Sequence, residues 1–310
     1  MSRYVWRRLL MLLPLVVGIT LVTFVLMNVI PGDPTISLMD PKRGQLDPQA
    51  AERIRQRWGL NDPAYLQYLK FLFNAVRGDL GFSFRFNQPV TRIILERFPA
   101  TLELGLAALV IATAVGVPGG IAAAVRQGGW LDASLMGFCV AGVSMPVFWL
   151  GLLLMYLFAV KLGVLPAGGY GSPSFLVLPS LTLGLSSMAM LSRMTRSAML
   201  EVLRQDYIRT ARSKGLAERV VVYKHALRNA LVPMVTVMGV QAGWLLTGAV
   251  ITENVFGWPG VGRLLVDCIG QRDLPVVQGC VLFTVGMFAL VNLVVDVLYA
   301  YIDPRIRLGR

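Results

Sequence analysis

Charged residues are scarce in this chain. They make up 15% of its 310 residues, whereas hydrophobic residues make up 55%, and a soluble domain carries about 25% charged residues. This deficit excludes a disordered chain and argues against a soluble enzyme. The net charge of +12 and the mean hydropathy of +0.64 indicate a membrane protein with basic loops and no role in nucleic-acid binding, because the basic residues stand beside long apolar runs.

Residues that carry catalytic and metal chemistry are equally scarce. The three cysteines, Cys139, Cys268 and Cys280, form neither a C-x-x-C pair nor an even-numbered disulfide framework. His225 is the sole histidine, and a zinc site of the H-E-x-x-H kind needs two. None of the five lysines follows a glycine, as the phosphate-binding loop of an NTPase requires. We therefore expect no catalytic residue, metal or cofactor in this chain.

Long apolar runs, by contrast, are abundant. A helix crosses the hydrocarbon core with about 17–25 largely apolar residues. The sequence predicts an all-α integral membrane protein with six such helices: 9–30, 100–124, 133–160, 175–191, 231–251 and 279–301. The first run is longer than the core of a signal peptide and ends without a small-x-small cleavage site, so we expect it to remain as an anchor.

The distribution of arginine and lysine predicts the orientation, since short cytoplasmic loops carry an excess of both. If residues 1–8 are cytoplasmic, then these residues, Arg126, the loop 192–230 and the tail 302–310 hold sixteen basic residues, against three in the two short external loops. Both termini are therefore expected in the cytoplasm, with the segment 31–99 outside. That segment is left out of the count because long loops cross regardless of charge.

Few ionisable residues lie within the predicted spans. Glu103 and Asp296 both stand near a span end, where a packing role is favoured and a functional one stays open. No acid or histidine lies at mid-membrane to relay protons, which argues against a stand-alone secondary carrier, the alternative kept here. An intramembrane serine hydrolase is disfavoured as well, because His225 lies in a cytoplasmic loop.

The external segments are not featureless. Asp47-Pro48 predicts a helix that ends at Gly59, and Asp62-Pro63 predicts a second one that ends at Gly78. The second helix has an apolar face suited to packing on other helices or on the membrane surface: Tyr65, Leu66, Leu69, Leu72, Phe73 and Val76. The external loop 252–278 is also apolar and is expected to fold back against the helices, as a gate or as simple packing.

The cytoplasmic loop 192–230 has the most informative pattern. A helical run over 194–213 is predicted to stop at Lys214-Gly215, where glycine can take a left-handed conformation. A second run continues into the fifth span and places four apolar residues on one helix face: Leu216, Val220, Tyr223 and Leu227. Basic residues flank them: Arg212, Lys214, Arg219, Lys224 and Arg228. Such a ridge suits a groove on a soluble partner, and packing on the chain's own helices fits equally well.

Two stretches of this loop resemble a known family. Residues 207–216 (YIRTARSKGL) and 225–233 (HALRNALVP) are similar to the coupling-loop signature of ABC-importer permeases. Ala211, Gly215 and Leu227 fit the general form of that signature.

The positions that differ from the general signature, together with the rest of the chain, resemble one branch of this family. Residues 209–211 read Arg-Thr-Ala where the general signature has Glu-Ala-Ala, as in the dipeptide and oligopeptide branch. Further blocks follow in the order of the B-type subunit of these permeases: 7–10 with 30–34, 78–81, 100–104, 144–149, 193–197, 258–263, 272–278 and 303–307.

The resemblance implies a type I ABC importer permease fold, with the core over 100–301, in an inner membrane. It implies a path formed with a second, C-type permease, an external solute-binding protein that delivers peptides or related small solutes, and two cytoplasmic ATPases that hold the ATP and magnesium. It also implies that the ATPases bind the loop 192–230, at Ala211, Gly215, Leu216, Arg219, Val220, Tyr223, His225, Leu227, Arg228 and Asn229.

Overall fold

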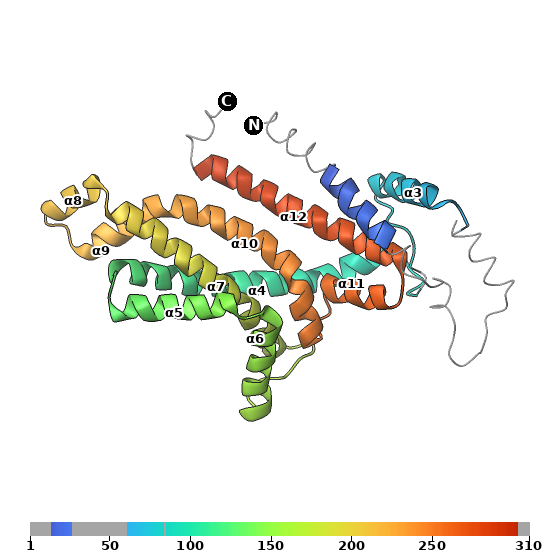
Figure 1. The fold of residues 1–310 in the computed structure, drawn as a ribbon, viewed down its shortest axis with the longest axis horizontal. Helices are drawn as coiled ribbons and strands as arrows, with labels where there is room; N and C mark the ends of the chain where they lie inside the picture. Colours follow the sequence, from blue (N-terminus) through green and yellow to red (C-terminus); the bar gives the residue numbers. More distant parts are fainter. Residues whose placement is uncertain (1–13, 27–60, 84, 303–310) are drawn as a thin grey trace. The chain divides into compact units, whose positions relative to one another are not determined.

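In the computed structural model the described residues are 14–26, 61–83 and 85–302, without the side chains of 232, 236, 246–248 and 296–302. They are helical between short connections (Figure 1), so the all-α prediction is confirmed for this part of the chain. The helices are Pro14–Leu26, α3 (Ala64–Val76), α4 (Val90–Val125), α5 (Trp130–Ser144), α6 (Val147–Leu154), the π-helix η2 (Met155–Lys161), α7 (Pro173–Leu203), α8 (Asp206–Ser213), α9 (Glu218–Val220), the π-helix η3 (Val221–Ala226), α10 (Leu227–Phe256), α11 (Val261–Gly270) and α12 (Leu274–Ile302).

Each of the six predicted spans is represented by an apolar helix or a bent pair of helices. Three helices, α4, α7 and α12, are long and apolar enough to cross a membrane, and two bent pairs, one of them within α10, raise this number to five among the described residues. The shorter helix Pro14–Leu26 occupies the middle of the first predicted span.

The span predicted over 133–160 is not one straight helix. Its two parts, Trp130–Ser144 and Val147–Lys161, meet at 107°. The cause is Pro146, which has no N–H to donate and disfavours helical geometry at the residue before it. Met145 is accordingly extended, with φ −86° and ψ 130°.

Two helices extend well beyond the apolar runs that predicted them. α4 begins at Val90, whereas the predicted span began at residue 100, and it contains Pro99. α7 continues from the predicted end at 191 to Leu203. Hydropathy marks where a helix can sit in hydrocarbon, not where its hydrogen bonds end, so the amino-terminal part of the predicted loop 192–230 is helix.

The chain forms two compact units. Unit 1 contains Thr101–Trp258 together with the segment from Met287 on, and in it α7 packs against α5, α6 and α10. Glycines allow close approach here: a Cβ at Gly120 would lie 2.5 Å from the carbonyl oxygen of Ser192, and one at Gly239 would lie 2.1 Å from Val295. These helix contacts of Gly120 and Gly239 are therefore packing within the chain.

Unit 2 contains the described residues up to Ala100 and Pro259–Gly286. The apolar loop that was expected to fold back is a packed helix, since Leu264 and Cys268 of α11 are buried with Ile94 at the start of α4. Burial raises the pKa of the Cys268 thiol to about 12, so this thiol stays protonated. The hydroxyl of Ser83 donates a hydrogen bond to the buried carboxylate of Asp273, which joins two distant parts of the sequence.

The second predicted external helix is present as α3. Its N-cap is Pro63 rather than Asp62, whose carboxylate lies 2.5 Å from the Lys70 ammonium. Gly78, with φ +82°, follows the end of the helix, as predicted. The first predicted helix, over 47–59, lies outside the described residues.

Candidate functional site: the cytoplasmic elbow

Residues 204–230 form a sharp turn between α7 and α10, which we call the elbow. The single helical run predicted over 194–213 is interrupted at Gln205, which is extended with ψ 150°, so that α7 and α8 are separate helices. After α8 the chain turns at Lys214–Ala217 and then runs without a break through α9, η3 and α10. In Figure 1 the elbow is the yellow and orange end of unit 1, labelled α8 and α9.

The turn is a Schellman motif centred on Gly215. The N–H of Gly215 donates to the carbonyl of Arg212 at 2.9 Å, and the N–H of Leu216 donates to that of Ala211 at 3.4 Å. Gly215 has φ +77°, and a Cβ at this position would meet nothing within 4 Å. Glycine is therefore needed for its conformation and not for space, and the predicted helix stop at Lys214-Gly215 is confirmed.

One side of the elbow belongs to the core of unit 1. Ile208 and Ala211 of α8 and Val221, Val222 and Ala226 of η3 are buried. They pack in one cluster with residues from α4, α7 and α10: Ile121, Ala124, Ala198, Met199, Ala230 and Met234. The elbow is therefore packed into unit 1, and this packing fixes which of its residues face away from the core.

The other side exposes apolar residues. Leu216 is 40% exposed, Val220 36% and Tyr223 59%, and we call these three the elbow ridge. Leu227, predicted on the same face, is instead half-buried against the core cluster. The reason is the π-helix over Val221–Ala226, whose wider turns shift the residues that follow it away from the face that an α-helix would present.

Polar contacts brace the elbow. The Arg212 guanidinium bridges the turn to Glu218, with Nε–Oε2 and Nη2–Oε1 distances of 3.1 and 2.6 Å. This hydrogen-bonded pairing lowers the pKa of Glu218 and raises that of Arg212. Asn229 donates to the hydroxyl of Tyr207 at 2.7 Å and so ties α10 to α8. His225 is half-buried within η3.

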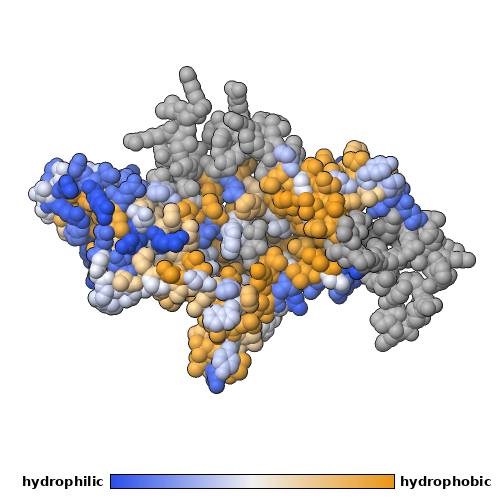
Figure 2. Space-filling model, in the orientation of Figure 1, coloured by the Kyte–Doolittle hydropathy of each residue, from blue (hydrophilic) through white to orange (hydrophobic). Residues whose placement is uncertain are grey.

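The ridge is surrounded by positive charge. Arg219, Lys224 and Arg228 are exposed, as are Arg212 and Lys214. Figure 2 shows hydrophilic residues gathered over the end of unit 1 that carries α8 and α9. An exposed apolar centre with a polar rim is the composition of a protein-binding surface.

A partly buried ion pair, which the sequence pattern did not predict, joins α7 to α5. Arg196 of α7 binds Asp132 of α5 through two hydrogen bonds, Nε–Oδ1 at 2.6 Å and Nη2–Oδ2 at 2.7 Å. Gly128 adds a backbone hydrogen bond of 3.0 Å to the same carboxylate. The pair fixes the α4–α5 turn to the helix that leads into the elbow, and its members are 64 positions apart in the chain.

Two further carboxylates lie near the other end of unit 1. Glu253 is fully buried and accepts a hydrogen bond of 2.7 Å from Thr101. It was missed because the fifth span was predicted to end at 251, whereas α10 continues to Phe256. Glu103 is exposed and lies 3.4 Å from the hydroxyl of Tyr170. The side chain of Asp296 lies outside the described residues.

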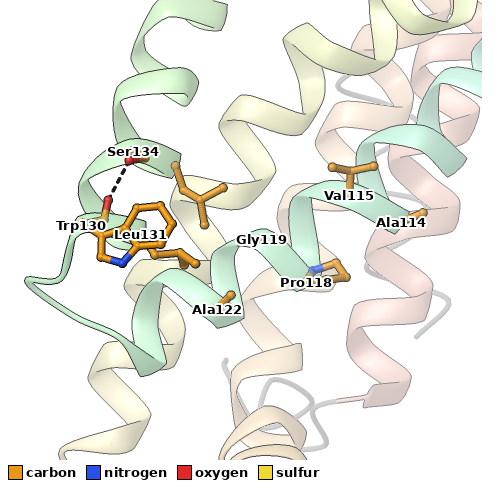
Figure 3. A pocket seen from close by; sticks show the side chains of 9 residues that line it. Ala114, Val115, Pro118, Gly119, Ala122, Trp130, Leu131 and Ser134 are labelled. Carbon is orange, nitrogen blue, oxygen red and sulfur yellow. Dashed lines mark hydrogen bonds between the residues drawn. The ribbon is translucent and has the colours of Figure 1, made fainter.

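An open cavity of about 530 Å³ lies between α4 and α5 (Figure 3). It is lined by Ala114, Val115, Pro118, Gly119, Ala122, Trp130, Leu131, Ser134 and Leu135. Ser134 has the only polar group among these side chains apart from the indole of Trp130, and its hydroxyl donates 2.8 Å to the carbonyl of Trp130. The cavity offers no charged group for the termini of a peptide. Across the described residues, no three His, Cys, Asp or Glu side chains are grouped to hold a metal.

The sequence matches two profiles of one family over nearly its whole length. The family described as "Binding-protein-dependent transport system inner membrane component" matches residues 116–308, and its amino-terminal companion matches residues 1–105. The "Dipeptide transport system permease protein DppB" of Escherichia coli is 42% identical over 99% of both chains. That of Alkalihalophilus pseudofirmus is 43% identical over 99% of this chain and all of its own. The "Glutathione transport system permease protein GsiC" of E. coli is 46% identical over 99% of both.

Solved structures show the same fold at low sequence identity. The permease fold of an inward-facing MetNI methionine ABC transporter superposes with a TM-score of 0.58 at 18% identity, over 68% of this chain and 96% of that one. An amino acid ABC transporter gives a TM-score of 0.51 at 16% identity, over 69% and 94%. With two family profiles that span the chain, full-length relatives above 40% identity and this fold, the chain belongs to the inner-membrane permease family of binding-protein-dependent transport systems.

Proposed function

We propose that this chain is a permease subunit of an ATP-driven importer that carries dipeptides, oligopeptides or related small solutes inward. Full-length identity above 40% to permeases named for dipeptide and glutathione transport carries the proposal. All of these named solutes are small peptides. A secondary carrier is not favoured, because the matching family is that of binding-protein-dependent transport systems.

The importer needs further subunits. A second, C-type permease completes the path, an external solute-binding protein delivers the cargo, and two cytoplasmic ATPases hold ATP and magnesium. This division of labour agrees with a sequence that has no phosphate-binding loop. The chain itself is then not an enzyme.

The elbow is where the ATPases bind. Its ridge of Leu216, Val220 and Tyr223 enters an apolar groove on an ATPase, and Arg219 and Arg228 steer the encounter from the rim. Ala211 and Leu227 support the ridge from the core side, and Gly215 sets the turn. Asn229 ties α10 to Tyr207 of α8, and its amide also donates to the backbone carbonyl of His225.

The mechanism is a shift between two states of the path, facing outward or inward. ATP binding favours one state only if it changes the contacts of the elbow. Because the buried side of the elbow shares one core with α4, α7 and α10, a displacement of the ridge moves these helices with it. The Arg196–Asp132 pair extends that connection to α5.

Reconstitution tests the function. The four kinds of subunit are purified together in lipid vesicles, and uptake of a radiolabelled dipeptide is measured with and without ATP. We expect ATP-dependent uptake that unlabelled dipeptide suppresses, and no ATP hydrolysis by this chain alone. Hydrolysis by the verified single chain, or uptake driven by an ion gradient without ATPases, would contradict the proposal.

A labelling experiment tests the orientation, which places both termini and the elbow in the cytoplasm. The three native cysteines are buried, so an engineered cysteine dominates the signal. Ser213→Cys on α8 should react with a membrane-impermeant maleimide only after the membrane is permeabilised. Ser172→Cys, in the exposed connection before α7, is the matched control and should react in intact spheroplasts. The reverse pattern would invert the topology.

A further inference from the structure

Two sequence blocks that the proposed function leaves without a role, 78–81 and 272–278, meet in unit 2. A Cβ built on Gly81 would lie 3.6 Å from the Cβ of Pro275. The first block leads into a turn that ends where α4 begins, and the N–H of Val90 donates to the carbonyl of Gly81 at 3.0 Å. Two segments that are distant in the sequence therefore form one local structure.

A buried carboxylate holds these segments together from inside. Asp273 accepts a hydrogen bond from the hydroxyl of Ser83, and its carboxylate lies 3.4 Å from the N–H of Arg85. The Ser83 oxygen accepts in turn from the N–H of Phe86 at 3.0 Å, and Phe86 packs against the buried cluster of unit 2. Arg85 and Arg272, which directly precedes Asp273, therefore start from neighbouring points of one rigid surface.

Arg272 is held in a conformation that favours glycine. Its φ is +59°. Its N–H donates to the carbonyl of Ile269 at 3.2 Å, and the N–H of Asp273 donates to that of Cys268 at 3.0 Å, which is the Schellman motif that also closes α8 at Gly215. Glycine adopts this conformation without strain, whereas it is uncommon for a residue with a long side chain. The backbone does not need an arginine here, so the outlier points to a function of its side chain.

The surface around this turn carries an excess of positive charge. Arg85 and Asn87 are exposed and Arg272 is half-buried, and we call these three residues the external patch. Asn87 also has a positive φ, of +52°. Within the part of the chain that the structure describes, no ion pair joins either arginine to an acid. The buried carboxylate of Asp273 balances at most one of the two positive charges.

The distribution of basic residues places the patch outside the membrane, since it belongs to the segments 31–99 and 252–278. Arginine binds carboxylates with two parallel hydrogen bonds, so an acidic protein surface is a matching partner. A rigid turn suits a partner of fixed shape, because little ordering is left to be done on binding. A lipid headgroup adapts to any basic side chain and does not require a strained backbone.

We propose that Arg85, Asn87 and Arg272 form part of the docking surface for the external solute-binding protein, and that the two arginines bind carboxylates on its surface. The inference rests on the proposed function, in which such a protein delivers the cargo. It adds the place on this chain where the delivery begins.

Stimulation of ATP hydrolysis tests the proposal on the complete importer in lipid nanodiscs. The rate is measured at increasing concentrations of the importer's solute-binding protein, loaded with a dipeptide. For Arg272→Gly and for Arg85→Ala we expect the half-saturating concentration to rise about tenfold, as for the loss of a charge-assisted hydrogen bond. Lys70→Ala removes an exposed cation of the same external segment outside the patch and should change it less than about twofold. The maximal rate should stay the same, because the elbow is intact.

Thermal unfolding separates docking from folding. Glycine accommodates the φ of Arg272, so Arg272→Gly should melt at the wild-type temperature or above it. A lower melting temperature together with weaker docking would mean that Arg272 braces the fold, and would overturn the proposal.

Two further results would overturn it. One is an unchanged half-saturating concentration for both arginine variants. The other is a rise that occurs only in nanodiscs with anionic lipid, which would assign the patch to headgroups. Absence of stimulation already in the wild type would instead contradict the proposed function, on which this inference rests.

Discussion

The elbow and α11 are both apolar connections outside the predicted spans, and they use their apolar residues in opposite ways. In α11, Val261, Leu264 and Cys268 are buried within unit 2, at 3%, 4% and 0% exposure. In the elbow ridge, Leu216 and Tyr223 remain 40% and 59% exposed. An apolar loop in a sequence therefore has two meanings. The residues of α11 complete the core of their own unit, whereas those of the elbow ridge remain on its surface.

The largest effect is expected from a charge placed in the self-contained region. Leu264→Glu would bury an unpaired carboxylate among apolar side chains, at a cost of several kcal/mol. We expect the protein to fail to accumulate in the membrane, as measured by immunoblot against Leu264→Met. Normal accumulation of the glutamate variant would show that the contacts of α11 contribute little to the fold.

Breaking the partly buried ion pair should have a smaller but clear effect. Arg196→Ala leaves Asp132, whose side chain is 6% exposed, without its main partner, at a cost of about 1–3 kcal/mol. Thermal unfolding can be followed with a thiol-reactive dye, because the native cysteines are buried. The double variant Asp132→Leu/Arg196→Met removes both charges and should recover most of the lost melting temperature. A lack of recovery would mean that the loss reflects geometry rather than an unpaired charge.

A glutamate introduced in the elbow ridge should leave the fold intact and weaken binding of the ATPases. Leu216→Glu is expected to accumulate normally, because the side chain is exposed, while association with the ATPases weakens by at least about 2 kcal/mol, roughly 30-fold. Co-purification of the ATPases at matched membrane levels measures this effect. Arg219→Ala, a rim change, should cost much less. Full association and transport of Leu216→Glu would remove the ridge from the interface.

A substitution at Gly215 tests the conformation of the elbow turn separately, because it adds no charge. Gly215→Ala requires an alanine at φ +77°, which costs about 1 kcal/mol, and meets no steric contact. We expect a several-fold loss of ATPase association with normal accumulation. Gly215→Asn, which tolerates positive φ better, is the control and should lose less. Equal losses would indicate that side-chain size matters there.

The smallest effect concerns the exposed Arg212–Glu218 pair. Because the pKa of Glu218 is lowered in the folded state, the pair stabilises above the ordinary pKa of glutamic acid, and this contribution is lost as pH falls through the lowered value. Both side chains are more than 40% exposed, so we expect a coupling below about 0.5 kcal/mol from a double-mutant cycle of Arg212→Ala and Glu218→Gln. A coupling above about 1 kcal/mol would make this pair the main brace of the elbow.

Features that depend on neighbouring residues in the sequence were predicted correctly. Apolar runs located the spans, and Gly215 marked the turn through its conformational freedom. Helix ends were missed at Val90 and Leu203, because helices continue beyond the hydrocarbon wherever tertiary packing supports them. The bend before Val147 could have been predicted from Pro146, but the continuous apolar run around this proline was interpreted as one straight span.

Features that depend on long-range contact were not predictable in the same way. The Arg196–Asp132 pair joins residues from separate helices, and Glu253 is recognisable as buried only once α10 is seen to pass residue 251. The ridge itself was half predicted: Leu216, Val220 and Tyr223 are exposed as a surface would need, while Leu227 packs inward. A π-helix cannot be recognised from the spacing of apolar residues, because that spacing is interpreted with the 3.6 residues per turn of an α-helix.

That π-helix sets the direction of the elbow ridge relative to α10. A π-turn holds about one residue more than an α-turn, so each of its residues rotates the chain by less than the roughly 100° of an α-helix. If the six residues Val221–Ala226 were α-helical instead, Leu216 and Val220 would be turned by roughly a quarter of a revolution relative to α10. A change that converted this π-helix into an α-helix would therefore redirect the ridge while Leu216, Val220 and Tyr223 all remained in place.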